Sequence, residues 1–244
     1  MRRLLLVNPN TSASISALLH SHAQAAAGPQ VQVQTLTARF GAPYIACEAS
    51  YAVAAHAVLD VWAMALQPQQ PRFDTVLLGC FGDPGLLALR QNSQLPVTGL
   101  AEASFVAAAE KGRFAIVTGG ARWKPMLERL AHSLGFGAQL AGVHTVQASG
   151  AQLAADPLAA QVLLARACNE AARQYGVQTV ILGGAGLAGM AAQIQPVVAP
   201  QLIDNVQAGV AHALRQAQQE TLQTRAVFDF SWSGVSAELA STGV

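Results

Sequence analysis

The chain contains one segment twice. Residues 74–86 read DTVLLGCFGDPGL, and residues 178–190 read QTVILGGAGLAGM. Each copy is an apolar run of strand length that leads into a glycine-rich turn. When the copies are aligned, three glycines of each turn coincide, and Cys80 of the first copy aligns with Gly184 of the second. A chain that repeats a strand and its turn in this way is expected to fold as two similar halves, with a thiol at the turn of the first half.

Strand and helix patterns alternate along both halves. Apolar runs typical of strands occur at residues 3–7, 31–36, 75–78 and 96–98, and again at 114–118, 139–146, 179–182 and 196–198. Helical spacing occupies residues 11–26, 49–66, 103–111, 124–134, 157–175 and 202–217. This alternation predicts parallel sheets covered by helices. We therefore expect an α/β fold with two pseudo-symmetric lobes, each a parallel sheet flanked by helices.

The chain is expected to pass from one lobe to the other near residues 98–102 and again near residues 200–208. The first lobe then comprises residues 1–100 and about 208–244, and the second comprises 101–207. Short polar residues predict where several helices begin: Thr11 or Ser12 and Asp156 as N-caps, and Asp83 as an N-cap with Pro84 in the first helical position. The Ser/Gly-rich tail from Ser231 is expected to be poorly ordered.

The composition narrows the classes of partner. Of the 244 residues, 52% are hydrophobic and 11% are charged, and the formal net charge is +1. Such a balance is typical of a protein with a large buried core and argues against a nucleic-acid-binding surface. The apolar run in the opening MRRLLLV is too short for a signal sequence. The most apolar helical stretch, residues 53–66, contains His56 and Asp60 and is therefore not expected to span a membrane. We expect a cytoplasmic protein that binds a small molecule, with no nucleic-acid or membrane partner.

The cysteines and histidines predict no metal site. The three cysteines are widely spaced and fit neither a disulfide framework nor a zinc site, which favours a reducing compartment. The six histidines show no metal-ligand spacing. Cys168 lies on the apolar side of a helix and is expected in the core, whereas Cys47 lies in a loop and is given no role. No metal or cofactor is expected.

Ligands of parallel α/β sheets bind beyond the carboxyl ends of the strands. Four strand ends carry polar or glycine-rich sequences: residues 8–10, 79–81, 118–120 and 183–185. Asn10, Thr118 and the amides of the turns could hold a planar imide or a carboxylate and absorb charge on an enolate oxygen. Asn8 and Asn10 could instead serve the turn itself, and Phe81 could be either a pocket wall or part of the core.

Cys80 is the strongest candidate for chemistry. It ends a predicted strand and precedes the helix that Asp83 and Pro84 are expected to open, so backbone N–H groups would point toward its sulfur. Helix N-termini lower the pKa of thiols. A thiolate here could remove a proton from carbon, and the thiol could return one. The alternative is that Cys80 is a small buried hydrophobic residue.

The second turn also contains a dinucleotide-like pattern. Residues 184–189 spell G-x-G-x-x-G after a strand, and Asp204 follows 20 residues after Gly184. Asp204, however, is expected at the start of a helix and not at the end of the next strand, and the pattern comes late in the chain. An anion or carboxylate bound by the turn amides is the favoured interpretation.

Four blocks of the sequence resemble the hydantoin racemase branch of the aspartate/glutamate racemase superfamily. They are VNPNTS at 7–12, GCFGDPGL at 79–86, IVTGGARW at 116–123 and VILGGAGLAGM at 180–190. The first two blocks together are a specific combination, and the resemblance runs from about residue 3 to residue 210. It implies two pseudo-symmetric lobes with the active site in the cleft between them, a homo-oligomer, and a reaction without cofactor or metal.

The resemblance also implies a mechanism. Family members remove and return a proton at a carbon next to a carbonyl, using two cysteines, one from each lobe, on opposite faces. By position Cys80 matches the first cysteine, and the second is expected at Gly184. The resemblance and the turn chemistry together give the following candidate substrate-binding residues: Asn10, Phe81, Gly82, Thr118, Gly119, Gly184, Ala185 and Gly186.

Gly184 has no proton to give, and loss of one general acid or base costs about 10²–10⁴-fold in rate. We expect a cofactor-independent racemase or epimerase that acts on a small cyclic imide or amino-acid derivative, such as a hydantoin or allantoin. Two alternatives stay open. One is a decarboxylase of malonate-type acids, similar to arylmalonate decarboxylases, which use a single cysteine on the second-lobe side. The other is a non-catalytic small-molecule-binding protein.

Overall fold

The computed structural model describes residues 1–148, 150–219 and 231–243. The chain divides into two compact units. Unit 1 comprises residues 1–79, 83–99 and 210–244, and unit 2 comprises residues 80–82 and 100–209. The tripeptide that starts at Cys80 is therefore grouped with unit 2, although the strand before it belongs to unit 1.

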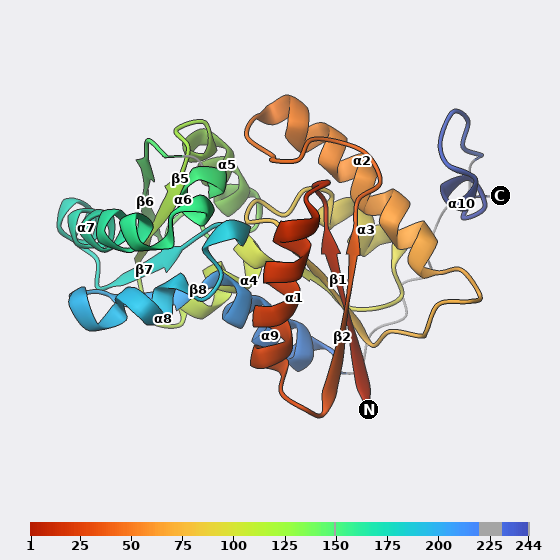
Figure 1. The fold of residues 1–244 in the computed structure, drawn as a ribbon, viewed down its shortest axis with the longest axis horizontal. Helices are drawn as coiled ribbons and strands as arrows, with labels where there is room; N and C mark the ends of the chain where they lie inside the picture. The colour runs from red at the N-terminus through yellow and green to blue at the C-terminus, as the bar shows by residue number, and fades with distance from the viewer. Residues whose placement is uncertain (149, 220–230, 244) are drawn as a thin grey trace. The chain divides into compact units, whose positions relative to one another are not determined.

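Unit 1 is built on a four-stranded parallel sheet in the order β2-β1-β3-β4. Its strands are β1 (Arg2–Asn8), β2 (Val31–Thr37), β3 (Thr75–Leu78) and β4 (Val97–Gly99). Its helices are α1 (Ala13–Ala27), α2 (Glu48–Ala65), α3 (Leu86–Asn92) and α10 (Ala237–Ala240). Helix α1 lies along β2 (Figure 1). The central strands β1 and β3 are buried, as near-continuous apolar runs require in a parallel sheet.

Unit 2 repeats this plan with a parallel sheet in the order β6-β5-β7-β8. Its strands are β5 (Phe114–Gly119), β6 (Leu140–Val146), β7 (Thr179–Leu182) and β8 (Gln201–Asp204). Its helices are α4 (Leu100–Ala109), α5 (Trp123–Ser133), α6 (Gly150–Ala155), α7 (Pro157–Tyr175) and α8 (Met190–Ile194), with single turns η1 (Ala185–Leu187) and η2 (Gln195–Val197). Helix α9 (Asn205–Gln216) begins in unit 2 and ends in unit 1. The predicted α/β fold with two similar halves is confirmed.

The repeat extends to the strand register. In unit 1, Val7 of β1 pairs with Leu78 of β3, and the N–H of Gly79 donates to the carbonyl of Val7 at 2.7 Å. In unit 2, Val117 pairs with Leu182, and the N–H of Gly183 donates to the carbonyl of Val117 at 2.9 Å. The two glycine-rich turns therefore leave their sheets from equivalent places.

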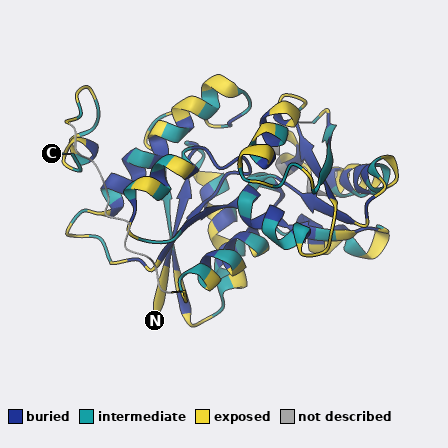
Figure 2. Cartoon of the chain, turned by 180° about the vertical axis from the view of Figure 1, so that it is seen from behind, coloured by how far each residue is buried: buried dark blue, intermediate teal, exposed yellow. Residues whose placement is uncertain are grey.

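Alternate residues of β5 pack into two layers of unit 2, because successive side chains of a strand point to opposite faces. Ala115 and Val117 join the apolar cluster formed with α7. Phe114 instead stacks on Phe105 of α4, with ring centroids 5.8 Å apart, and the ring of Phe136 lies at the same distance from Phe105. The central strands are buried along most of their length, the edge strands β2 and β6 only in part, and the outer faces of the helices are the most exposed (Figure 2).

Two helix N-caps are confirmed. The hydroxyl of Ser12 accepts a hydrogen bond from the N–H of Ile15 at the start of α1. The carboxylate of Asp156 accepts one from the N–H of Ala159 in α7. Each cap satisfies a backbone donor that the helix itself leaves unpaired.

The predictions around residues 196–204 are wrong. Residues 195–197 form the single turn η2, and the last strand is β8, whose Gln201 N–H donates to the carbonyl of Gln178. The apolar residues Leu202, Val206 and Val210 follow helical spacing, so the strand and the start of α9 cannot be separated by periodicity alone.

The prediction of a poorly ordered tail from Ser231 is also wrong for the described part of it. Ser236 caps α10, and Leu239 is buried. Arg39 forms ion pairs with Glu238 of α10 and with the buried Asp60 of α2. The prediction failed because long-range pairing, which composition does not reveal, holds this segment in place.

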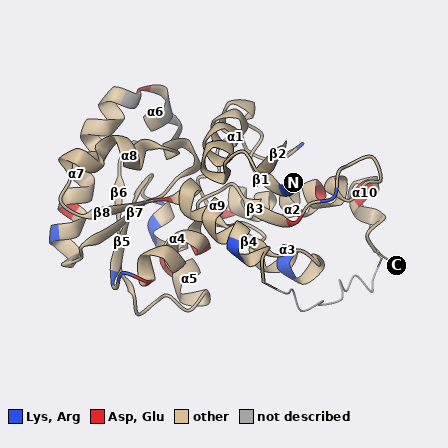
Figure 3. Cartoon of the chain, turned by 90° about the horizontal axis from the view of Figure 1, so that it is seen from below, with Lys and Arg blue, Asp and Glu red and all other residues tan. Residues whose placement is uncertain are grey.

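Charged residues occur at scattered positions along the chain in both units (Figure 3). The chain holds 14 Lys and Arg residues and 13 Asp and Glu residues. Within the described ranges, every helix is too short or too polar to traverse a lipid bilayer.

Candidate active site

The first turn (residues 79–85) follows β3 and presents Cys80 at the carboxyl end of that strand. Cys80 is 7% exposed. The N–H of Gly82 donates to the carbonyl of Cys80 at 3.0 Å, which closes a tight turn around Phe81. The N–H of Gly82 is therefore used within the turn and is not available to a substrate.

Phe81 connects the first turn to the second turn (residues 183–189). Its ring lies against Gly183, where any Cβ would overlap with the ring. The ring also meets Phe105 edge to face, with centroids 6.3 Å apart. Phe81 is 3% exposed and thus extends the aromatic core of unit 2.

Gly82 lies against the turn that follows β5. A Cβ at Gly82 would come within 2.8 Å of the Trp123 ring, at the first residue of α5. Residues 80–82 are thus packed between the segments that follow β5 and β7, the two central strands of the unit 2 sheet. This packing explains why the tripeptide is grouped with unit 2.

The prediction that Asp83 caps a helix with Pro84 in its first position is wrong. Helix α3 begins at Leu86, and its N-cap is Gly85 in the left-handed region, with φ 77°. Asp83 itself has φ 52° and is, within the described part of the chain, the one non-glycine residue with positive φ. Helix α3 therefore begins six positions after Cys80, so the predicted helix start at Asp83 and Pro84 no longer supports activation of the Cys80 thiol.

The second turn has a different conformation at the position equivalent to Cys80. Gly184 has φ 148°, a region that side-chain-bearing residues rarely adopt. A Cβ built there would lie 3.3 Å from Cγ of Leu187, which fills the space beside Gly184. Gly189 then caps α8 with φ 77°, as Gly85 caps α3.

The second turn offers free backbone donors. Gly184, Ala185 and Gly186 are partly exposed. Because η1 starts at Ala185, the first N–H groups of this turn have no carbonyl before them to bond. Among the described residues, the N–H groups of Ala185 and Gly186 donate no hydrogen bond, whereas that of Leu187 donates to the carbonyl of Gly184.

Two residues hold the second turn: Asn205, which the sequence did not single out, and Asp204, which it considered only for a dinucleotide site. The side-chain amide of Asn205 donates to the carbonyls of Leu182 and Gly184, both at 3.0 Å. The carboxylate of Asp204 accepts from the N–H of Gly189 at 2.9 Å. The alignment of the two halves points to them when one residue is inserted in the second half, because Asp204 in the last strand of unit 2 then aligns with Gly99 in the last strand of unit 1.

The same contacts argue against a dinucleotide site. Asp204 directly precedes α9 and accepts from N–H groups of its first turn, as its predicted place at a helix start requires, but it also ends β8, so the prediction that it does not end a strand is wrong. Its carboxylate nevertheless accepts from three backbone N–H groups, those of Gly189, Val206 and Gln207, so it has little capacity left for a ribose hydroxyl. Helix α8 after the turn has five residues, too short for the helix of a dinucleotide fold.

Asn10 and Thr118 lie at the carboxyl ends of β1 and β5. In unit 1, Asn10 Oδ1 accepts from the N–H of Ser12 and from Asn8, which fixes the orientation of the Asn10 amide. Its Nδ2 donates to no group among the described residues. In unit 2, the hydroxyl of Thr118, next to Gly119, likewise forms no hydrogen bond within the described ranges.

The other cysteines have structural positions. Cys168 is completely buried in the apolar cluster of unit 2, as predicted, and burial raises the pKa of its thiol to about 12. Cys47, predicted in a loop, is the N-cap residue of α2, with its sulfur 3.5 Å from the hydroxyl of Ser50. The three cysteines all lie within the described residues and form no disulfide with one another.

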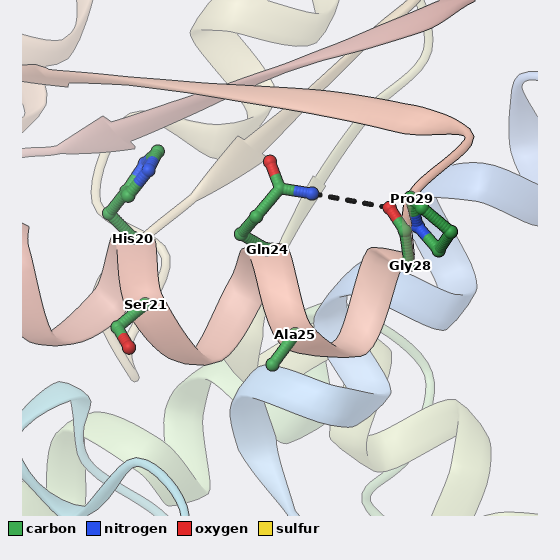
Figure 4. Close-up of a pocket in the computed structure, with 6 residues that line it drawn as sticks. All are labelled: His20, Ser21, Gln24, Ala25, Gly28 and Pro29. Atoms are coloured by element: carbon green, nitrogen blue, oxygen red, sulfur yellow. Dashed lines mark hydrogen bonds between the residues drawn. The ribbon is translucent and has the colours of Figure 1, made fainter.

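Unit 1 has a surface hollow that none of the predicted site residues lines. Figure 4 shows it beside α1, lined by His20, Ser21, Gln24, Ala25, Gly28 and Pro29. The Gln24 amide donates to the carbonyls of Gly28 and Val31, so its donors serve the connection between α1 and β2. Gly28 and Pro29 precede β2, at the opposite edge of the sheet from Asn10. No group of three or more possible metal ligands occurs among the described residues.

Comparison with known proteins gives the family. Residues 4–213 match the Asp/Glu/hydantoin racemase family, and the chain belongs to it. Racemases are isomerases.

The particular relatives include allantoin racemases and hydantoin racemases. The allantoin racemase from Klebsiella pneumoniae is 29% identical, with a TM-score of 0.86 over 100% of this chain and 99% of that one. The allantoin racemase from Pseudomonas fluorescens is 28% identical, with a TM-score of 0.86 over 95% and 100% of the two chains. The hydantoin racemase of Pseudomonas sp. (strain NS671) is 28% identical over 86% of this chain and 84% of its own length.

Proposed function

We propose that this protein is a cofactor-independent racemase or epimerase of a small cyclic imide of the hydantoin or allantoin type, with Cys80 as its acid/base. The observation that carries the proposal is the position of Cys80: its thiol sits at the carboxyl end of a central strand, in a turn packed against the backbone of the second turn. The relatives named above act on substrates of this class.

The reaction needs three things from the protein. A base must take the proton from the carbon next to the carbonyl, donors must stabilise the enolate oxygen, and an acid must return a proton. Cys80 thiolate takes the proton, and the C–H electron pair moves into the enolate. The resulting Cys80 thiol then returns a proton to the same face of the carbon.

The donors for the ring carbonyls are groups that form no hydrogen bond with the residues that the structure describes. We assign this role to the N–H groups of Ala185 and Gly186, Nδ2 of Asn10 and the hydroxyl of Thr118. Gly119 is the last residue of β5, and the chain turns after it at Gly120, which has φ 91°. Gly82 and Phe81 act through packing, because the Gly82 N–H is bonded to Cys80 and the Phe81 ring is buried.

The second face of the carbon has no side chain from Gly184. Proton return with inversion therefore relies on water at that face, and we expect exchange with retention to be faster than inversion. This single thiol is also the observation that favours the second candidate, a decarboxylase in which Cys80 would protonate the enediolate left by a malonate-type acid.

One assay tests these alternatives. A single enantiomer of a 5-substituted hydantoin is incubated with the protein in deuterated water, and deuterium content and configuration are followed separately. We expect deuterium to enter with retained configuration faster than inversion occurs. Cys80→Ser should slow both by about 10²–10⁴-fold, whereas the matched variant Cys47→Ser should slow neither.

Other outcomes lead elsewhere. Release of carbon dioxide from arylmalonates without exchange into hydantoins would establish the decarboxylase in place of the racemase. If neither hydantoins, allantoin nor malonates react faster than with the Cys80→Ser variant, the catalytic proposal is wrong and a binding function replaces it.

A further inference from the structure

A buried carboxylate lies at the base of each glycine-rich turn, but it comes from a different element in each unit. In unit 1 the turn supplies it: the carboxyl group of Asp83 lies against Gly99, at the end of β4. In unit 2 the neighbouring strand supplies it: Asp204 ends β8 and accepts from the N–H of Gly189 in the turn. Both carboxylates are less than one-tenth exposed.

The strand register makes these places equivalent. Leu78 pairs with Gly99 in unit 1, and Leu182 pairs with Asp204 in unit 2. Gly99 and Asp204 therefore occupy the same position of the repeated sheet. In the aligned turns, Asp83 corresponds to Leu187. The acidic residue has thus exchanged places between turn and strand, while a carboxylate remains at the junction in both halves.

The space at the junction of unit 1 is shaped for this exchange. A Cβ at Gly99 would overlap with the carboxyl carbon and both carboxyl oxygens of Asp83, so the strand must be glycine where the turn is aspartate. Asp83 adopts φ 52° to bring its side chain there, a strained backbone for a residue with a side chain. Such strain persists where surrounding contacts hold the residue firmly, and it is frequent at functional sites.

We propose that Asp83 is a positioning residue for Cys80: its buried carboxylate locks the first turn to the end of β4, as Asp204 locks the second turn to the end of β8. This inference rests on the proposed role of Cys80. Asp83 is 1% exposed and follows Cys80 by three residues, so it acts on the conformation of the turn and not on the substrate.

The equivalence of the two junctions supplies the experiment. Asp83→Gly removes the carboxylate and relieves the backbone. Gly99→Asp alone places a second carboxyl group where Asp83 already lies. The double variant Asp83→Gly with Gly99→Asp moves the carboxylate from turn to strand, which reproduces the arrangement of unit 2. Gly99 has ordinary strand backbone, and the three atoms nearest to a Cβ there all belong to Asp83, so Asp83→Gly removes them.

Three measurements are made on each variant: kcat and KM for deuterium exchange into a hydantoin, the pH profile of Cys80 alkylation by iodoacetamide, read by peptide mass spectrometry, and the melting temperature. Each single variant should lose at least tenfold in kcat with little change in KM, and its alkylation profile should shift. The double variant should recover at least a third of the wild-type kcat and the original profile. Asp156→Ala, which removes the N-cap of α7, is the matched control for stability: it should lower the melting temperature and leave the profile unchanged.

A double variant no better than the single variants overturns the proposal, and so does an alkylation profile that Asp83→Gly leaves unchanged. The alkylation readout separates this inference from the proposed function. If the wild-type protein exchanges no hydantoin proton but Cys80 alkylation still responds to Asp83 and recovers in the double variant, the racemase proposal fails and the positioning role stands.

Discussion

The first and second turns begin from equivalent strands yet treat the same position in opposite ways. Cys80 occupies it in the first turn with ordinary backbone, and Gly184 occupies it in the second with φ 148°. Leu187 fills the space beside Gly184, whereas Asp83 takes the corresponding place in the first turn. The glycine is therefore not a cysteine with its side chain removed, because the backbone and its neighbours differ as well.

This difference teaches that one half of a repeated fold can keep its scaffold while the chemistry at its turn changes. The register, the glycine caps at Gly85 and Gly189 and the junction carboxylates are shared. The thiol and the conformation around it are not. Substitutions at three places test whether the two halves are true counterparts.

The largest effect is expected from a thiol in the second turn. Gly184→Cys should raise the rate of inversion of a hydantoin enantiomer at least about tenfold over that of Gly184→Ala, because a second acid/base then serves the other face. Gly184→Ala is the matched control: it carries the same strain, about 1–3 kcal/mol, and the same contact with Leu187, but no thiol. Chiral chromatography measures inversion. Equal rates in two folded variants would show that the two turns are not functional counterparts.

A smaller effect is expected from the glycines that begin the turns. Gly183→Ala should lower the free energy of unfolding by about 2–3 kcal/mol, because its methyl group would displace the buried Phe81 ring. Gly79→Ala should cost less, about 1 kcal/mol, since its methyl group would meet the end of the Leu19 side chain at 2.9 Å and the Val7 carbonyl oxygen at 3.1 Å, without overlapping with a buried ring. Urea unfolding measures both. The reverse order would mean that Phe81 is not held rigidly between the two turns.

These contrasts also show what the sequence could predict. The repeated strands, the parallel sheets and the caps at Ser12 and Asp156 follow from local patterns, and so does the buried Cys168. The start of α3 does not, because Asp83 and Pro84 look like a cap while Gly85 performs that role. The position at which α3 begins depends on the contact between Asp83 and Gly99, which lie in different segments, and no local sequence pattern encodes such a contact.

The residues of the candidate site also fall into those that the sequence could predict and those that it could not. Glycine-rich strand ends identified Cys80, Thr118 and the second turn, because their residue types and positions are visible in the sequence. Asn205 was missed, since its amide donates to carbonyls that lie 21 and 23 residues earlier in the chain. The N–H of Gly82, assigned to substrate from sequence, serves its own turn instead. Hydrogen-bond partners of this kind become known only from the folded backbone.

The smallest effect is expected from the ionic contacts, which are partly buried in unit 1 and exposed in unit 2. In unit 1, burial raises the pKa of Asp60, but hydrogen bonds from Arg39 and Ser236 and the charges of Arg39 and His56 outweigh burial, so the pKa lies below its ordinary value. Asp60→Asn should lower the free energy of unfolding by about 1–2 kcal/mol at neutral pH, because Arg39 is partly exposed and its pairing is screened. Thermal unfolding measures this.

The pH dependence follows from the direction of the shift. A carboxyl group with a lowered pKa stabilises the fold fully above its ordinary pKa of about 4 and loses that contribution as the pH falls through the lowered value. The difference between wild type and Asp60→Asn should therefore shrink below about pH 4. Glu170→Gln is the control in unit 2: its pair with Arg166 lies on the surface, and its loss should change little. A difference that grows on acidification would contradict the assignment.

The buried thiol of Cys168 has a practical consequence. With its pKa raised to about 12 and no exposed surface, it resists alkylation while the α7 side of the unit 2 core stays closed. It becomes reactive once that core opens, so its labelling rate in the native protein reports the frequency of such openings. Mass spectrometry of Cys168 alkylation would therefore measure how often the core of unit 2 opens, with a residue that the protein already contains.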